Sequence, residues 1–106
     1  MIRPDLKKRF DDEIRSHKVV LYMKGNADFP RCGFSAAALE ALRPFGAVYT
    51  VDVLVDPEVR EGIKEYSNWP TIPQCYINGK FVGGSDIVRE LAERGELGDL
   101  IQGTVA

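Results

Sequence analysis

The spacing of apolar positions predicts a helix followed by a buried strand at the start of the chain. Leu6, Phe10 and Ile14 recur every fourth residue, which indicates one apolar face of a helix from Pro4 to Ser16. The next apolar run, Val19–Met23, is unbroken and rich in branched and aromatic side chains. Such a run is typical of a strand that is buried on both faces.

The middle of the chain predicts a second strand that lies parallel to the first. Strong helix formers from about Gly33 to Pro44 precede an apolar stretch at 47–53, so a helix joins the two strands. This connection favours a parallel pair. Asp56 and Pro57 then give a helix start. On these two helices we expect the inward side chains to be Phe34, Ala38 and Leu42, and then Val59, Ile63 and Tyr66.

The last part of the chain predicts a hairpin and two helices. The prolines of segment 69–73 end the third helix, and segment 74–83 contains Asn78-Gly79, a strong hairpin signal. A helix then begins at Ser85-Asp86, with Ile87, Val88 and Leu91 expected to face inward, and a short segment around Leu97, Leu100 and Ile101 follows. The predicted fold is therefore α/β, with a four-stranded mixed sheet flanked by helices on both faces, in one domain of residues 1–106.

Composition limits the classes of function. Apolar residues make up 44% of the chain and charged residues 28%, as in soluble globular proteins. The net charge of -2 argues against nucleic acid as a partner, because nucleic-acid binding needs clustered positive charge. No apolar run approaches the ~18 to 20 residues of a membrane helix, and the first residues have no signal-peptide core. We therefore expect a cytoplasmic protein without a membrane partner.

The candidate chemistry lies at Cys32, between the buried strand and the first turn of the second helix. Unpaired N–H groups at a helix start favour a thiolate, and Lys24 and Arg31 add positive charge. Ser35 occupies the position of a resolving thiol, so Cys32 closes no disulfide within its motif. The thiol can form a mixed disulfide with an outside thiol, bind a metal or cluster, or act as a nucleophile. A small apolar residue without chemistry is the alternative interpretation.

Two further residues are interpreted as structural. Cys75 falls in the first strand of the hairpin, where a buried thiol is the favoured interpretation. His17 is the single histidine and lies between the first helix and the first strand. It has no second imidazole with which to share a metal, so we interpret it as a surface residue.

Four motifs and the order of the elements resemble a known family. The motifs are Lys24-Gly25, Cys32-Gly33-Phe34-Ser35, Trp69-Pro70-Thr71-Ile72-Pro73-Gln74 and Gly83-Gly84-Ser85-Asp86. The order of elements resembles the thioredoxin fold, and the motifs resemble the monothiol, CGFS-type glutaredoxins over nearly the whole chain from Val19 to Ile101. The chain departs from many such proteins at Ser85, where they carry a cysteine that can pair with the active one.

The resemblance implies a glutathione site. In this family two cations, here Lys24 and Arg60, meet the glycyl carboxylate, and the main chain of Ile72 pairs with the cysteinyl unit. Ser85 and Asp86 hold the γ-glutamyl end, with Thr71, Pro73 and Gly84 nearby, and Trp69 lies close to the groove. The resemblance also implies that Pro73 is cis and faces Cys32. Taken without the resemblance, the cations would be solvated surface residues, Ser85 and Asp86 a plain helix cap, Pro73 an ordinary trans proline and Trp69 a packing residue.

The resemblance also implies three functions. In the first, Cys32 from each of two subunits and two glutathione molecules ligate a bridging 2Fe-2S cluster, which the homodimer passes to iron–sulfur client proteins. In the second, Cys32 reduces mixed disulfides between proteins and glutathione as a thiol-disulfide oxidoreductase, an activity that is generally weak in this family. In the third, the chain is an adaptor for BolA-type partners. The first is favoured, because one cysteine per chain reaches four ligands only by sharing.

Overall fold

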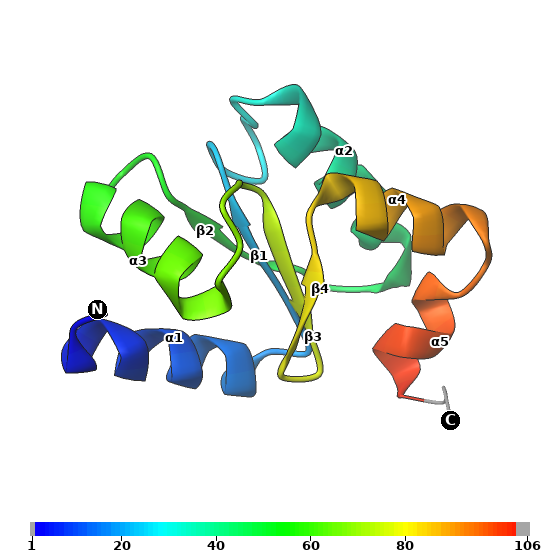
Figure 1. The fold of residues 1–106 in the computed structure, drawn as a ribbon. Helices are drawn as coiled ribbons and strands as arrows, with labels where there is room; N and C mark the ends of the chain where they lie inside the picture. The colour runs from blue at the N-terminus through cyan, green and yellow to red at the C-terminus, as the bar shows by residue number, and fades with distance from the viewer. Residues whose placement is uncertain (1, 104–106) are drawn as a thin grey trace.

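The element order of the structure, a computed structural model that describes residues 2–103, agrees with the predicted order (Figure 1). Met1 and residues 104–106 of the predicted domain lie outside the described residues. The elements are α1 (Pro4–Ser16), β1 (Val19–Met23), α2 (Gly33–Leu42), the 3-10 helix η1 (Arg43–Phe45), β2 (Tyr49–Asp52), α3 (Pro57–Ser67), β3 (Gln74–Ile77), β4 (Lys80–Gly83), α4 (Ser85–Glu93) and α5 (Leu97–Gln102).

The four strands form one mixed sheet in the order β2-β1-β3-β4. β1 and β2 are parallel, as the intervening helix predicts, and the other neighbours are antiparallel. The hairpin between β3 and β4 turns at Asn78 and Gly79, whose φ angles of 52° and 83° are both left-handed. A two-residue turn of this kind matches the twist of the flanking strands.

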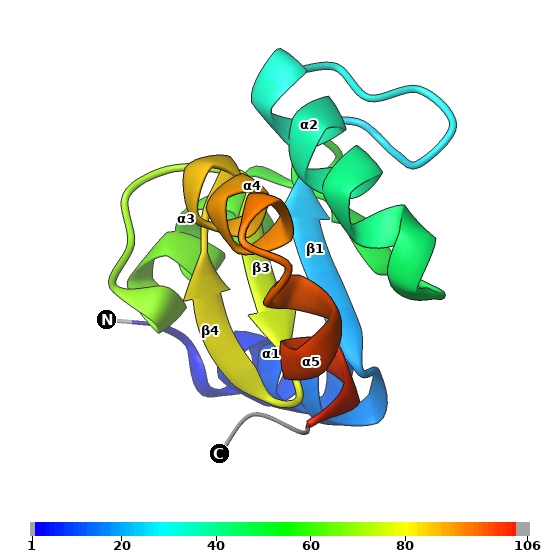
Figure 2. The same ribbon diagram turned by 90° about the vertical axis from the view of Figure 1, so that its right-hand side faces the viewer.

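Helices cover both faces of the sheet, as predicted (Figure 2). β1 is buried along its whole length, and its side chains alternate between two hydrophobic clusters. Val20 and Tyr22 face the cluster that includes side chains of α1 and α3. Val19, Leu21 and Met23 face the cluster that includes side chains of α2, α4 and α5. The central strand therefore fixes both helical layers relative to one another.

Two of the expected inward positions are wrong. Phe34 is 63% exposed and Ile87 is 37% exposed, whereas Leu39 is buried on α2. Both exposed side chains lie in the first turn of their helices and line the pocket that is described below. Their surroundings are therefore a cavity wall, which periodicity does not distinguish from a core. Among residues 2–103, no helix is long and apolar enough to span a membrane.

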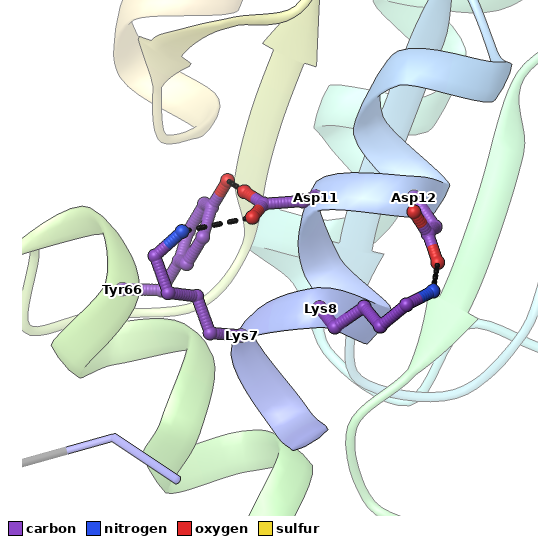
Figure 3. A network of polar contacts seen from close by, with 5 residues as sticks. All are labelled: Lys7, Lys8, Asp11, Asp12 and Tyr66. Atoms are coloured by element: carbon purple, nitrogen blue, oxygen red, sulfur yellow. Dashed lines mark hydrogen bonds and ion pairs between the residues drawn. The ribbon is translucent and has the colours of Figure 1, made fainter. Parts of the chain in front are cut away.

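Polar contacts dock α1 against α3 and the sheet, and Figure 3 shows the contact with α3. Asp11 accepts hydrogen bonds from the Tyr66 hydroxyl of α3 at 2.6 Å and from Lys7 Nζ at 2.8 Å. Glu13 accepts a hydrogen bond from the Tyr22 hydroxyl of β1 at 2.8 Å. These contacts join α1 to α3 on one side and to β1 on the other.

We predict that the two neighbouring acids of α1 differ in their contribution to stability. Asp11→Asn should lower the free energy of unfolding by about 1 kcal/mol, because it weakens the bonds from Lys7 and Tyr66. Asp12→Asn breaks only an exposed ion pair with Lys8, so it should cause no measurable change in the free energy of unfolding. Urea titrations of both variants measure the difference.

The pH dependence gives a second readout of this prediction. Hydrogen bonds from Lys7 and then Tyr66 lower the pKa of Asp11 below its usual value. The stability from Asp11 is therefore present above about pH 4 and lost as pH falls through the lowered pKa. The gap between the wild type and Asp11→Asn should close at acid pH. Equal effects of the two substitutions at pH 7 would contradict the prediction.

Candidate functional site

A pocket of about 590 Å³ opens at the end of the sheet where β1 ends and β3 begins. Its walls come from four parts of the chain: the residue after β1, the start of α2, the face and end of α3 with the segment that follows it, and the start of α4. The lining residues are Lys24, Phe34, Arg60, Lys64, Trp69, Pro70, Thr71, Ile72, Pro73, Gly84, Ser85, Asp86 and Ile87. Segments far apart in sequence therefore meet at one site.

The structure brings together all the residues that the resemblance assigned to glutathione. Each of them, from Lys24 to Asp86, lines this pocket. Cys32 does not line it, but it lies two residues before Phe34, which does. The charge of Lys24 also acts on the Cys32 thiol. The thiol thus lies beside the pocket rather than in its wall.

The Cys32 thiol is half-buried and is placed to ionise easily. Cys32 is the residue directly before α2 and has an extended backbone conformation. Its side chain is a free thiol and makes no capping hydrogen bond to the helix. The backbone N–H of Ser35 contributes most to lowering the pKa of Cys32, and burial opposes it. The N–H of Phe34, the Ser35 hydroxyl and the Lys24 charge also lower this pKa. Cys32 is therefore a better nucleophile and metal ligand at neutral pH than an ordinary cysteine.

Ser35, at the position of a resolving thiol, holds the loop that enters the site. Its side chain is fully buried, and its hydroxyl accepts a hydrogen bond from the Lys24 N–H at 3.1 Å. The same loop is fixed from β2, because the Asp52 carboxylate accepts a hydrogen bond from the Gly25 N–H at 3.0 Å. Gly25 has a φ of +88°, and a Cβ there would lie 2.5 Å from the Phe29 carbonyl oxygen. Only glycine fits at this position.

The wall after α3 contains the cis proline that the resemblance implied. The Ile72–Pro73 bond is cis, so the interpretation of Pro73 as an ordinary trans proline is wrong. Trp69 lines the pocket and also packs on Phe81, with ring centroids 5.7 Å apart. Trp69 is therefore a packing residue, as interpreted, and also lines the pocket. Gln74, fully buried at the start of β3, bonds to this wall.

Positive charge gathers where α3 borders the pocket. Lys24, Arg60 and Lys64 all line it, and Lys64 also pairs with Glu61 at 3.3 Å. Arg60 is half-buried, and its Nε has no hydrogen-bond partner among the described residues. A buried donor without a partner is costly and is suited to an anionic ligand. Sequence reasoning missed Lys64, although its spacing of four from Arg60 places both on one helix face.

The start of α4 leaves backbone N–H groups available to the pocket. Gly84 is the residue before the helix, and no side chain caps it. Ser85 and Asp86 are the first two helical residues, so their interpretation as a plain cap is wrong. Ser85 is buried, whereas the Asp86 carboxylate is exposed at the pocket. The open N–H groups suit a carboxylate, and Asp86 suits an amine.

The chain supplies one reactive thiol. Cys75 is fully buried, and burial raises its pKa to about 12, which confirms the prediction of a structural thiol. His17 is exposed, as predicted, and stacks on Tyr49 with ring centroids 3.8 Å apart. Within residues 2–103 no group of three or more histidine, cysteine or acidic side chains could hold a metal ion. Cys32 is thus not part of a group of metal ligands in the described part of the chain.

Comparisons with known proteins agree with the fold and the site. The glutaredoxin family model matches residues 19–82. An uncharacterized monothiol glutaredoxin, ycf64-like, from Synechocystis sp. is 49% identical over 106 residues, covering 99% of each chain. The mitochondrial monothiol glutaredoxin-5 of Saccharomyces cerevisiae is 49% identical over 92% of this chain and 68% of its own. The solution structure of reduced poplar apo GrxS14 has a TM-score of 0.82 at 45% identity, covering 92% of this chain and 91% of that one.

We predict that iodoacetamide labels Cys32 but not Cys75 in the folded protein, as mass spectrometry can measure. The pH profile of labelling should have its midpoint below the ordinary cysteine value of about 8.5. Ser35→Ala should move this midpoint upward, because the Ser35 hydroxyl favours the thiolate. Cys32→Ser is the control and should abolish labelling until denaturant exposes Cys75. A midpoint that stays unchanged or falls in Ser35→Ala would contradict the assigned role of the hydroxyl.

Proposed function

This chain belongs to the glutaredoxin family, among its monothiol members, and on that premise we propose that it binds glutathione in the pocket beside Cys32. Two copies, each with one glutathione, hold a 2Fe-2S cluster between them as cargo and pass it to iron–sulfur client proteins. The observation that carries the proposal is one easily ionised thiol next to a pocket with cations at one wall and an acid at another. The proposal treats residues 1–106 as one domain.

The charges around the pocket fit the three charged groups of glutathione. The tripeptide has two carboxylates and one amine. Lys24 and the unpartnered Arg60 Nε suit the glycyl carboxylate. The first N–H groups of α4, including that of Ser85, suit the γ-glutamyl carboxylate, and Asp86 suits the amine next to it. Ile72, between them, offers its main chain to the cysteinyl unit.

The number of thiols supports a shared cluster. A 2Fe-2S cluster takes four thiolate-type ligands. Each chain offers only Cys32, because Cys75 is buried and its pKa is raised. Two chains and two glutathione thiols supply the four ligands. Because two of these ligands exchange freely with solution, the cluster is easily passed on.

The lowered pKa of Cys32 also favours a second function, reduction of protein–glutathione mixed disulfides. The Cys32 thiolate attacks the glutathionyl sulfur, and the S–S bond breaks so that the protein sulfur leaves with the electron pair as a thiolate. A second glutathione then attacks the Cys32–glutathione disulfide, which releases oxidised glutathione and restores the Cys32 thiolate. We propose that this oxidoreductase activity is at most weak.

The proposal includes partners at the exposed surface beside Cys32. Phe29 is 70% exposed and Phe34 is 63% exposed, so an apolar surface flanks the thiol. We propose that BolA-type proteins and client proteins dock there. The proposed compartment is the cytoplasm, a reducing one, although two of the relatives carry the words mitochondrial and chloroplastic in their names.

Anaerobic reconstitution with ferrous iron, a sulfide source and glutathione tests the shared-cluster proposal. We expect a brown dimer by visible absorption and size-exclusion chromatography, and no colour when glutathione is omitted. Cys75→Ser should behave as the wild type, whereas Cys32→Ser should stay colourless. A colourless wild-type monomer that efficiently reduces a glutathionylated protein would replace the carrier function with the oxidoreductase.

Removing the charge of Asp86 should weaken glutathione binding. Asp86→Asn keeps the shape of the side chain but loses the ion pair with the amine, so we expect about tenfold weaker binding by isothermal titration calorimetry. Asp12→Asn, on the exposed face of α1, is the matched control and should bind as the wild type. Wild-type affinity in Asp86→Asn would remove Asp86 from the proposed site.

A further inference from the structure

Gln74 is a large polar side chain with no exposed surface, and it bonds to residues of the pocket wall without lining the pocket itself. Burial of an amide is costly unless its donors and acceptor are all bonded. Gln74 is the first residue of β3, and its main chain is paired with Tyr22 of the buried central strand. It therefore connects the rigid sheet to the segment 69–73, which belongs to no helix or strand.

Every polar atom of the Gln74 amide has a partner. Its Nε2 donates to the carbonyl oxygens of Trp69 at 3.1 Å and Thr71 at 3.3 Å. Its Oε1 accepts from the Tyr76 hydroxyl at 3.2 Å. The orientation of the amide is fixed by chemistry, because the two carbonyl oxygens can only accept. The side chain thus spans from a core tyrosine to the pocket wall.

The bond to Thr71 sets the direction of the next N–H group. The Thr71 carbonyl and the Ile72 N–H belong to one peptide plane, and in a trans peptide they point in opposite directions. Among the described residues the one cis bond is the next one, Ile72–Pro73. Because the Thr71 carbonyl points to buried Gln74, the Ile72 N–H points away from Gln74. Ile72 lines the pocket.

We propose that Gln74 is a positioning residue: by holding the Thr71 carbonyl it aims the Ile72 N–H into the pocket, where a peptide ligand pairs with it. This inference rests on the proposed function only for the identity of that ligand, glutathione. The positioning itself is a property of the ligand-free protein. Gln74 touches no ligand and acts through the segment 69–73.

Gln74→Leu tests the inference without any ligand. Loss of both donors should let the segment sample several conformations, so the amide signals of Thr71 and Ile72 in ¹H–¹⁵N NMR spectra should broaden or double. The amides of β1 should keep their wild-type shifts. The matched control is Tyr22→Phe, which removes another hydroxyl hydrogen bond on the same face of the sheet, to Glu13. It should leave the Ile72 signal single.

Glutathione affinity gives the second readout. Under a phosphine reductant, Gln74→Leu should bind glutathione about tenfold more weakly than the wild type, and Tyr22→Phe should bind equally well. Because Tyr22→Phe should also lower stability by removing its bond to Glu13, this pair separates positioning from general destabilisation. The pH profile of Cys32 labelling should stay unchanged in Gln74→Leu, since Gln74 has no contact with that thiol.

Gln74→Glu keeps the test decisive if the leucine variant fails to fold. A protonated carboxyl at this position donates one hydrogen bond, whereas a carboxylate donates none. Affinity for glutathione should therefore fall between about pH 5 and 8 in this variant, while the wild type changes little. Absence of this added pH dependence would overturn the inference.

The outcomes distinguish the inference from the proposed function. A single, unshifted Ile72 signal in Gln74→Leu would overturn the positioning role whether or not glutathione binds. If the wild type does not bind glutathione but the Ile72 signal broadens in Gln74→Leu, the positioning role holds and the proposed function fails. Equal affinities of the wild type and Gln74→Leu for glutathione would overturn the claim that positioning of the Ile72 N–H by Gln74 contributes to ligand binding.

Discussion

The burial of β1 on both faces is the constraint on which the rest of the structure depends. All five of its side chains are buried, so helices must cover the sheet on both sides. Its end at Met23 then fixes where the chain must leave the core. Because β3 runs antiparallel beside it, the start of β3 lies at the same edge. The loop before Cys32 and the wall around Pro73 are therefore brought together by one strand and its neighbour.

Polar groups are buried where the site needs rigidity. Among residues 2–103 the buried polar side chains are Ser35, Gln74 and Ser85. Ser35 bonds to the loop after β1, Gln74 bonds to the segment after α3, and Ser85 begins the helix at the third wall. An unbonded polar group is expensive in a protein interior, so the bonds of Ser35 and Gln74 favour one arrangement of the segments that they hold.

The sequence predicted the order of the elements and most of the core, because these depend on local periodicity. It predicted Phe34 and Ile87 wrongly, because periodicity reports which side of a helix is apolar but not whether that side meets a core or a cavity. The cis bond before Pro73 followed from the resemblance and not from the residues, which favour trans at an isolated proline. Lys64 and Gln74 were missed as contributors to the site, since their roles depend on contacts between distant segments.

The absence of a second reactive thiol limits the disulfide partners that are available to Cys32. Ser35 holds the loop through its hydroxyl, and the buried thiol of Cys75 has a raised pKa, so neither can resolve a disulfide at Cys32. A thiolate that the protein stabilises but cannot pair must take its partner from solution. The pocket beside it is lined by side chains of both charges, which fits the small zwitterionic thiol of the proposed function. In the proposed function, dependence on an external thiol follows from where this chain places its two cysteines.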